Sequence, residues 1–78
     1  MDLDNISFEP SNMYASRPHL RTAYKTAVAN WAGRPSNAVY AVIVNGPHTS
    51  ISDRRKHITV DYKDENNAFI TRSHVPHA

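Results

Sequence analysis

The sequence predicts one α+β domain, in which a single amphipathic helix packs on a three- or four-stranded antiparallel sheet. The chain has 78 residues, which is enough for one domain with one core. One segment repeats its apolar residues at helical spacing, and the segments after it have the composition or alternation of strands. With the order (β)-α-β-β-β, the helix has to cover one sheet face. We therefore treat residues 1–78 as one unit, with an acidic segment at 1–15 and a tail at 75–78.

A short edge strand is expected near the start, at residues 6–8. Apolar, polar and apolar side chains alternate there as Ile6, Ser7 and Phe8. Pro10 should end this strand, because proline has no N–H to donate to a sheet. Residues 10–16 are then expected to form a loop.

The helix is predicted over residues 17–32. Pro18 suits its first turn, where a missing N–H costs nothing, and Gly33 is expected to stop it. The N-cap stays open between Ser16, a good capping residue, and Arg17, which precedes proline and resists helical geometry. The apolar face consists of residues at i, i+3, i+4, i+7, i+8 and i+11: Leu20, Ala23, Tyr24, Ala27, Val28 and Trp31.

A buried central strand is predicted at residues 38–44. This run is entirely apolar and rich in β-branched residues, which is typical of a strand covered on both faces. Asn45, Gly46 and Pro47 are expected to break it. A polar loop should follow over residues 48–55.

Two further strands are predicted at residues 57–63 and 68–74, with a turn at 64–67. The first alternates strictly, so that Ile58, Val60 and Tyr62 should face the helix. The opposite face should stay hydrated or contact a partner. Its expected residues are Thr59, Asp61 and Thr71, and Phe69 and Ile70 should lie on different faces of the last strand.

Composition excludes several classes of function. Cysteine is absent, so the chain has no disulfide and no thiolate metal site, which fits a reducing compartment. Its longest apolar run, residues 38–44, is far shorter than the roughly 20 residues that cross a bilayer. The first residues are acidic, whereas a secretion signal begins with basic ones. With only two glycines there is no glycine-rich phosphate loop. We expect no cofactor, and a location in the cytoplasm of the producing cell or of a host cell.

The basic residues form two clusters, although the net charge is only +2. On the helix, three cations at i, i+4 and i+8 line one edge of the apolar stripe. The second cluster lies in the loop that enters the 57–63 strand. Such clusters contact phosphates or acidic protein surfaces, but they are also common on solvated surfaces, and the acidic residues of segment 1–15 could neutralise the first one. The candidate binding residues are Arg17, Arg21, Lys25, Arg54, Arg55 and Lys56.

No catalytic or metal-binding motif is present. The five histidines (His19, His48, His57, His74 and His77) lack the spacing and the companion ligands of a metal site. A metal-independent ribonuclease remains an alternative, because histidines can exchange protons and cations can stabilise a charged phosphorus intermediate. Its residues would lie on the last two strands: His57, Tyr62, Lys63, Arg72 and His74.

The sequence favours a small non-enzymatic binding protein. We expect an inhibitor or accessory factor that docks on an acidic protein surface or on a nucleic-acid-handling complex; small phage inhibitors of host machinery are an analogy of size and composition only. Tyr40, Tyr14 and Met13 are candidate contacts, since both residue types are enriched at interfaces. Direct nucleic-acid binding and the toxin-like ribonuclease are the alternatives, and self-association stays open because so small a core often gains stability from a partner subunit.

Overall fold

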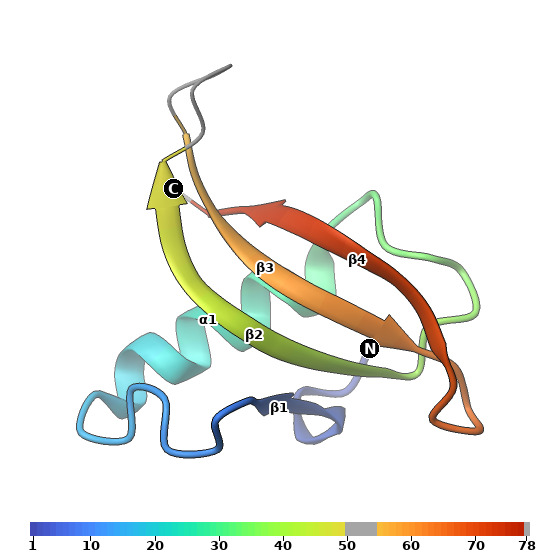
Figure 1. The fold of residues 1–78 in the computed structure, drawn as a ribbon, viewed down its shortest axis with the longest axis horizontal. Coiled ribbons are helices and arrows are strands. Elements are labelled where there is room, and N and C mark those ends of the chain that lie inside the picture. The colour runs from blue at the N-terminus through green and yellow to red at the C-terminus, as the bar shows by residue number, and fades with distance from the viewer. Residues whose placement is uncertain (50–54, 78) are drawn as a thin grey trace.

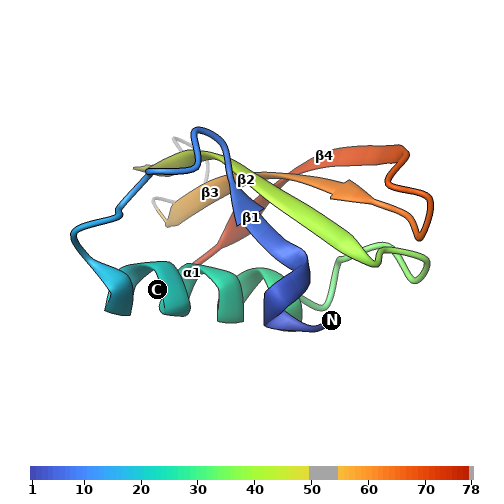
Figure 2. The same ribbon diagram turned by 90° about the horizontal axis from the view of Figure 1, so that it is seen from below.

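In the part of the chain that the structure describes, one α-helix packs on one four-stranded sheet. Figures 1 and 2 show how the two are arranged. The computed structural model describes residues 1–49 and 55–77. Helix α1 (Pro18–Asn30) covers one face of the sheet, and no helix of these described residues covers the other face. A short 3-10 turn, η1 (Leu3–Asn5), precedes the first strand. The predicted α+β class is confirmed. The strands, in the sheet order β1-β2-β3-β4, are β1 (Ile6–Phe8), β2 (Tyr40–Thr49), β3 (Lys56–Lys63) and β4 (Phe69–Pro76).

The sheet is mixed, which corrects the expected antiparallel arrangement. Strand β1 runs parallel to β2, with Ile6 opposite Ala41 and Phe8 opposite Ile43. The other two pairings, β2 with β3 and β3 with β4, are antiparallel. The connection explains the difference: β1 reaches β2 through α1, and a crossover helix returns the chain in the same direction, whereas a short hairpin reverses it.

Helix α1 ends at Asn30, two residues before the predicted end. Trp31 follows in an extended conformation, so its side chain is not part of the helix face. Instead the indole stacks on the Tyr62 ring, with 6.1 Å between centroids and 19° between planes. The ring also lies over Gly33, where a Cβ would come within 2.6 Å of the indole. At the other end, Arg17 is the N-cap and makes no side-chain capping bond.

Strand β2 continues to Thr49, five residues beyond the predicted end at Val44. Two register shifts against β3, between Ile43 and Asn45 and between Asn45 and His48, let the strand pass through its glycine and proline. Such irregularities are where a strand tolerates these residues. A Cβ at Gly46 would also overlap the Tyr14 hydroxyl, so any side chain here would force Tyr14 to move. The expected break is therefore a bulged strand.

The core lies between α1 and the inward residues of the sheet. The Tyr62 side chain is completely buried, and its hydroxyl donates a hydrogen bond of 3.1 Å to the carbonyl of Val28 on α1. Val75, which we expected in the tail, is also fully buried because β4 extends to Pro76 opposite the start of β3. The buried apolar residues are Ile6, Phe8, Tyr24, Val28, Ala29, Ala41, Ile43, Ile58, Val60, Tyr62 and Val75.

Candidate functional site

The helix-free face of the sheet is organised in rows that run across β2, β3 and β4. Residues directly opposite one another on neighbouring strands project to the same face. Because Ile58, Val60 and Tyr62 are buried towards α1, the alternate positions of β3 define the outward rows. Figure 1 looks onto this face, with α1 behind the sheet. The rows are Tyr40–Lys63–Phe69, Val42–Asp61–Arg72, Asn45–Thr59–His74 and His48–His57–Pro76.

The row Tyr40–Lys63–Phe69, here called the aromatic row, exposes apolar surface. Tyr40 is 37% exposed and Phe69 is 62% exposed, and they are the exposed large hydrophobic residues of the part of the chain that the structure describes. Lys63 lies between them in the register. Tyr40 was predicted to be a contact residue. Its alignment with Phe69 was not predicted, because it depends on the irregularity between Tyr62 and Lys63.

The next row holds an ion pair. The Nε of Arg72 donates to Oδ1 of Asp61 at 2.6 Å, and Nη2 donates to Oδ2 at 3.0 Å. The hydrogen bond from Arg72 holds the pKa of the Asp61 carboxyl below its ordinary value, and the same contact raises the pKa of the guanidinium. This two-point contact fixes the guanidinium in the middle of the face.

Three imidazoles meet at the other end of this face, and we call His48, His57 and His74 the histidine cluster. The ring of His48 lies 6.4 Å from that of His57 and 5.4 Å from that of His74, centroid to centroid. The Nδ1 of His74 is 3.4 Å from the hydroxyl of Thr59. Thr59 was expected to be hydrated, but it is only 7% exposed beneath these side chains.

Sequence reasoning identified two members of the histidine cluster and missed the third. His57 and His74 were placed on neighbouring strands, as observed, whereas His48 was assigned to a loop. The usable signal was the glycine–proline pair before His48, which marks a bulge as readily as a break. Tyr62, also named for the ribonuclease alternative, faces the core. Its hydroxyl is therefore on the wrong side of the sheet for that chemistry.

Of the basic residues on the helix, Arg21 is engaged within the molecule. Its Nη1 donates to the backbone carbonyls of Met13 at 2.5 Å and Ser11 at 3.2 Å. Its guanidinium also lies 4.3 Å from the centre of the Phe8 ring. These contacts tie the segment before α1 to β1. Arg21 thus has a structural role that the i, i+4, i+8 pattern did not indicate.

One basic residue from each cluster, Arg17 and Lys56, lies near a contact between Tyr24 and His77. The two rings lie 4.9 Å apart, and the backbone N–H of His77 donates to the carbonyl of Lys56. Burial raises the pKa of Tyr24 while Arg17 opposes the shift, and burial lowers the pKa of His77 with the charges of Lys56 and His57 adding to it. The start of α1 and the start of β3 are therefore neighbours, next to the histidine cluster. Of the other candidate binding residues, Lys25 lies on α1 and Arg55 directly precedes β3. Arg54 lies outside the described residues.

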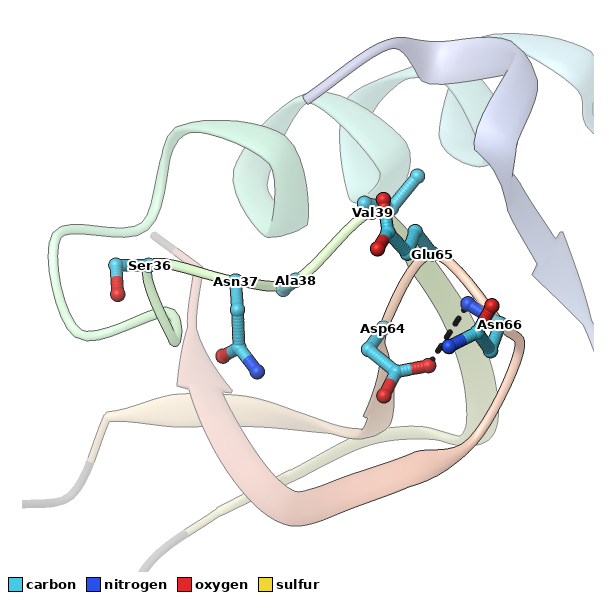
Figure 3. A pocket seen from close by; sticks show the side chains of 7 residues that line it. All are labelled: Ser36, Asn37, Ala38, Val39, Asp64, Glu65 and Asn66. Atoms are coloured by element: carbon cyan, nitrogen blue, oxygen red, sulfur yellow. Dashed lines mark hydrogen bonds between the residues drawn. The ribbon is translucent and has the colours of Figure 1, made fainter.

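A shallow hollow of about 350 Å³ lies at the opposite end, between residues 36–39 and the β3–β4 turn (Figure 3). Of its acidic residues, Asp64 is already engaged, because its Oδ1 accepts hydrogen bonds of 2.9 Å from the backbone N–H groups of Asn66 and Ala68. In the described residues no group of three histidine, cysteine or acidic side chains is arranged to hold a metal ion. None of the described helices is long and apolar enough to cross a membrane.

Comparison with protein-family models, curated proteins and solved structures finds no match to this chain. The features that bear on function are therefore the helix-free face and the cations Arg17 and Lys56 beside the Tyr24–His77 contact.

Proposed function

We propose that this chain is a small binding protein that holds single-stranded nucleic acid on the helix-free face of its sheet. The observation that carries the proposal is the aromatic row, in which Tyr40 and Phe69 are exposed on either side of Lys63. Aromatic side chains on an open sheet provide stacking surfaces for unpaired bases, and adjacent cations pair with the phosphates that link them. Two strand spacings separate Tyr40 from Phe69 by roughly 10 Å, so one chain can contact both.

Charge on this face supports an anionic ligand. Its rows contain the cations Lys63 and Arg72, while Asp61 is the acidic member and is paired with Arg72. Arg17 and Lys56, near the Tyr24–His77 contact, add positive charge beyond the histidine cluster. A phosphate backbone that crosses the sheet from the aromatic row would therefore meet positive groups along its path.

An acidic protein surface is the second candidate ligand, and it would suit an inhibitor or accessory factor. The observation in its favour is that Arg17 and Lys56, from separate clusters, lie around the same Tyr24–His77 contact. Such a partner would dock against the end of the molecule rather than the aromatic row. In either form we propose a cytoplasmic protein, since the cysteine-free composition fits a reducing compartment.

The test is fluorescence anisotropy with short labelled RNA and DNA oligonucleotides. Phe69→Ala should weaken binding by about 1–3 kcal/mol, which is the usual contribution of one stacked base. Lys63→Ala should weaken it and reduce its salt dependence by about one phosphate contact. Lys25→Ala is the matched control, because it removes the same charge from α1, which lies on the opposite side of the sheet from the proposed binding face.

Two results would contradict the proposed ligand. Failure to bind either oligonucleotide at low salt would exclude nucleic acid as the ligand. A Lys25→Ala defect equal to that of Lys63→Ala would move the binding site from the sheet face to the helix. A purification of partners from nuclease-treated lysate then tests the acidic protein surface, which predicts capture that is lost in the double variant Arg17→Ala, Lys56→Ala.

A further inference from the structure

The histidine cluster lies on the face that we propose for nucleic acid, yet binding alone does not require three imidazoles from three strands. They come from β2, β3 and β4 and meet only because β2 continues past its glycine and proline. We infer that the histidine cluster is a metal-independent RNA-cleaving site, in which His48 and His74 act as base and acid on one phosphodiester. This inference rests on the proposed nucleic-acid function and adds a reaction to it.

The two rings are oriented through their Nδ1 atoms. The Nδ1 of His48 lies 3.5 Å from the carbonyl oxygen of Gly46, which can only accept a hydrogen bond. We therefore assign the proton of the neutral ring to Nδ1, which leaves a lone pair on Nε2 for a base. The Nδ1 of His74 faces the Thr59 hydroxyl, so its Nε2 is likewise the nitrogen turned away from β3. With the ring centroids 5.4 Å apart, the two imidazoles are close enough to act on one phosphodiester.

The reaction is an internal transesterification that needs no co-reactant. His48 Nε2 removes the proton of the ribose 2′-hydroxyl, and the 2′-oxygen attacks the adjacent phosphorus. The new P–O2′ bond forms as the P–O5′ bond breaks, and the imidazolium of His74 donates its Nε2 proton to the departing 5′-oxygen. The products are one RNA ending in a 2′,3′-cyclic phosphate and one beginning with a 5′-hydroxyl.

Positive charge beside the cluster would stabilise the phosphorus centre while both bonds are partly formed. Arg72 occupies the row next to that of His74 on the same face, and its position is fixed by Asp61. A guanidinium that is already held in place needs little reorganisation when negative charge develops on the non-bridging oxygens. Tyr62, by contrast, takes no part, because it faces the core.

The experiment incubates the full chain with a doubly labelled single-stranded RNA in the presence of EDTA and identifies the products by mass spectrometry. We expect cyclic-phosphate and 5′-hydroxyl ends, and a DNA strand of the same sequence should bind but stay intact because it lacks the 2′-hydroxyl. His48→Gln and His74→Gln should each lower the cleavage rate at least about 100-fold, the usual range for a lost acid or base. His19→Gln on α1 is the matched control and should cleave like the parent.

Binding of the uncleavable DNA strand and the thermal midpoint of each variant separate the possible failures. A protein that binds the DNA strand but leaves RNA intact would overturn the cleavage inference and keep the proposed function. A protein that neither binds nor cleaves would overturn both. Cleavage that survives both substitutions in folded variants, or that also cuts DNA, would remove the histidine cluster from the reaction.

Discussion

Replacing Tyr62 by phenylalanine removes a single hydroxyl from the centre of the core. That hydroxyl donates to the carbonyl of Val28, which belongs to the last turn of α1. The last four carbonyls of a helix have no partner within the helix, so Tyr62 closes one of these ends. The phenylalanine variant leaves a buried acceptor unpaired, and we expect a loss of about 1–3 kcal/mol at neutral pH. For a domain of this size, each lost kcal/mol lowers the melting temperature by about 4–8 °C.

The same substitution should change how stability depends on alkaline pH. Burial, slightly opposed by Arg34, raises the pKa of Tyr62 from 10.0 to about 12. Because the folded pKa is above the unfolded one, the contribution is fully present below pH 10 and is lost as pH rises from 10 to 12. Two pKa units correspond to about 3 kcal/mol. Tyr62→Phe should abolish this part of the loss, and the smaller part due to Tyr24, whose pKa burial also raises, should remain.

Urea unfolding followed by Trp31 fluorescence and circular dichroism, at neutral pH and through the alkaline range, measures both effects. Tyr40→Phe is the control, because it removes the hydroxyl of an exposed side chain and should leave both curves unchanged. If Tyr62→Phe loses as much stability between pH 10 and 12 as the parent, ionisation of the buried hydroxyl is not the cause. The reasoning about the helix end would fail if the variant were as stable as the parent at neutral pH.

Three further substitutions test other contacts. Asp61→Asn breaks the exposed ion pair with Arg72, so it should cost no more than about 1 kcal/mol of stability. Because folding lowers the pKa of Asp61, the difference in stability from the parent should fade in acid titrations as pH falls below about 3.8. Arg21→Met keeps most of the apolar stem but removes the donors to the segment before α1, and thermal melts should show a loss of about 1–3 kcal/mol. Gly46→Ala forces Tyr14 aside, and the same melts should show about 1–3 kcal/mol lost; an unchanged midpoint would mean that the tyrosine moves freely.

Local periodicity was enough to predict the layers of this fold. The alternation in β3 and the apolar stripe of α1 placed Tyr24, Val28 and Tyr62 in one core, as observed. The burial of these residues follows from their spacing within one helix or strand, and that spacing can be read directly from the sequence. The direction of β1 was not predictable in the same way, because three residues carry no mark of parallel or antiparallel pairing and the outcome depends on the route of the chain.

The candidate site depends on relations between strands, and for that reason much of it was missed. The three cations on α1 looked accessible in the sequence, but Arg21 donates to carbonyls of segment 10–16 and lies over the Phe8 ring. The histidine cluster needed the register of two antiparallel pairings, and both pairings contain register shifts. Phe69 joined the aromatic row through another such shift. Bulges change which face a side chain occupies, and alternation alone cannot locate them.

Strand β1 has a protective effect on the rest of the sheet. It occupies the edge of β2 along Ala41–Ile43, and its side chains Ile6 and Phe8 are almost fully buried. Without those three residues the most apolar strand of the molecule would present free N–H and C=O groups to any other chain. Shortening the protein from its amino end past Phe8 should therefore promote edge-to-edge assembly beyond any that the full chain shows. Affinity tags placed there need a spacer long enough to leave this strand seated.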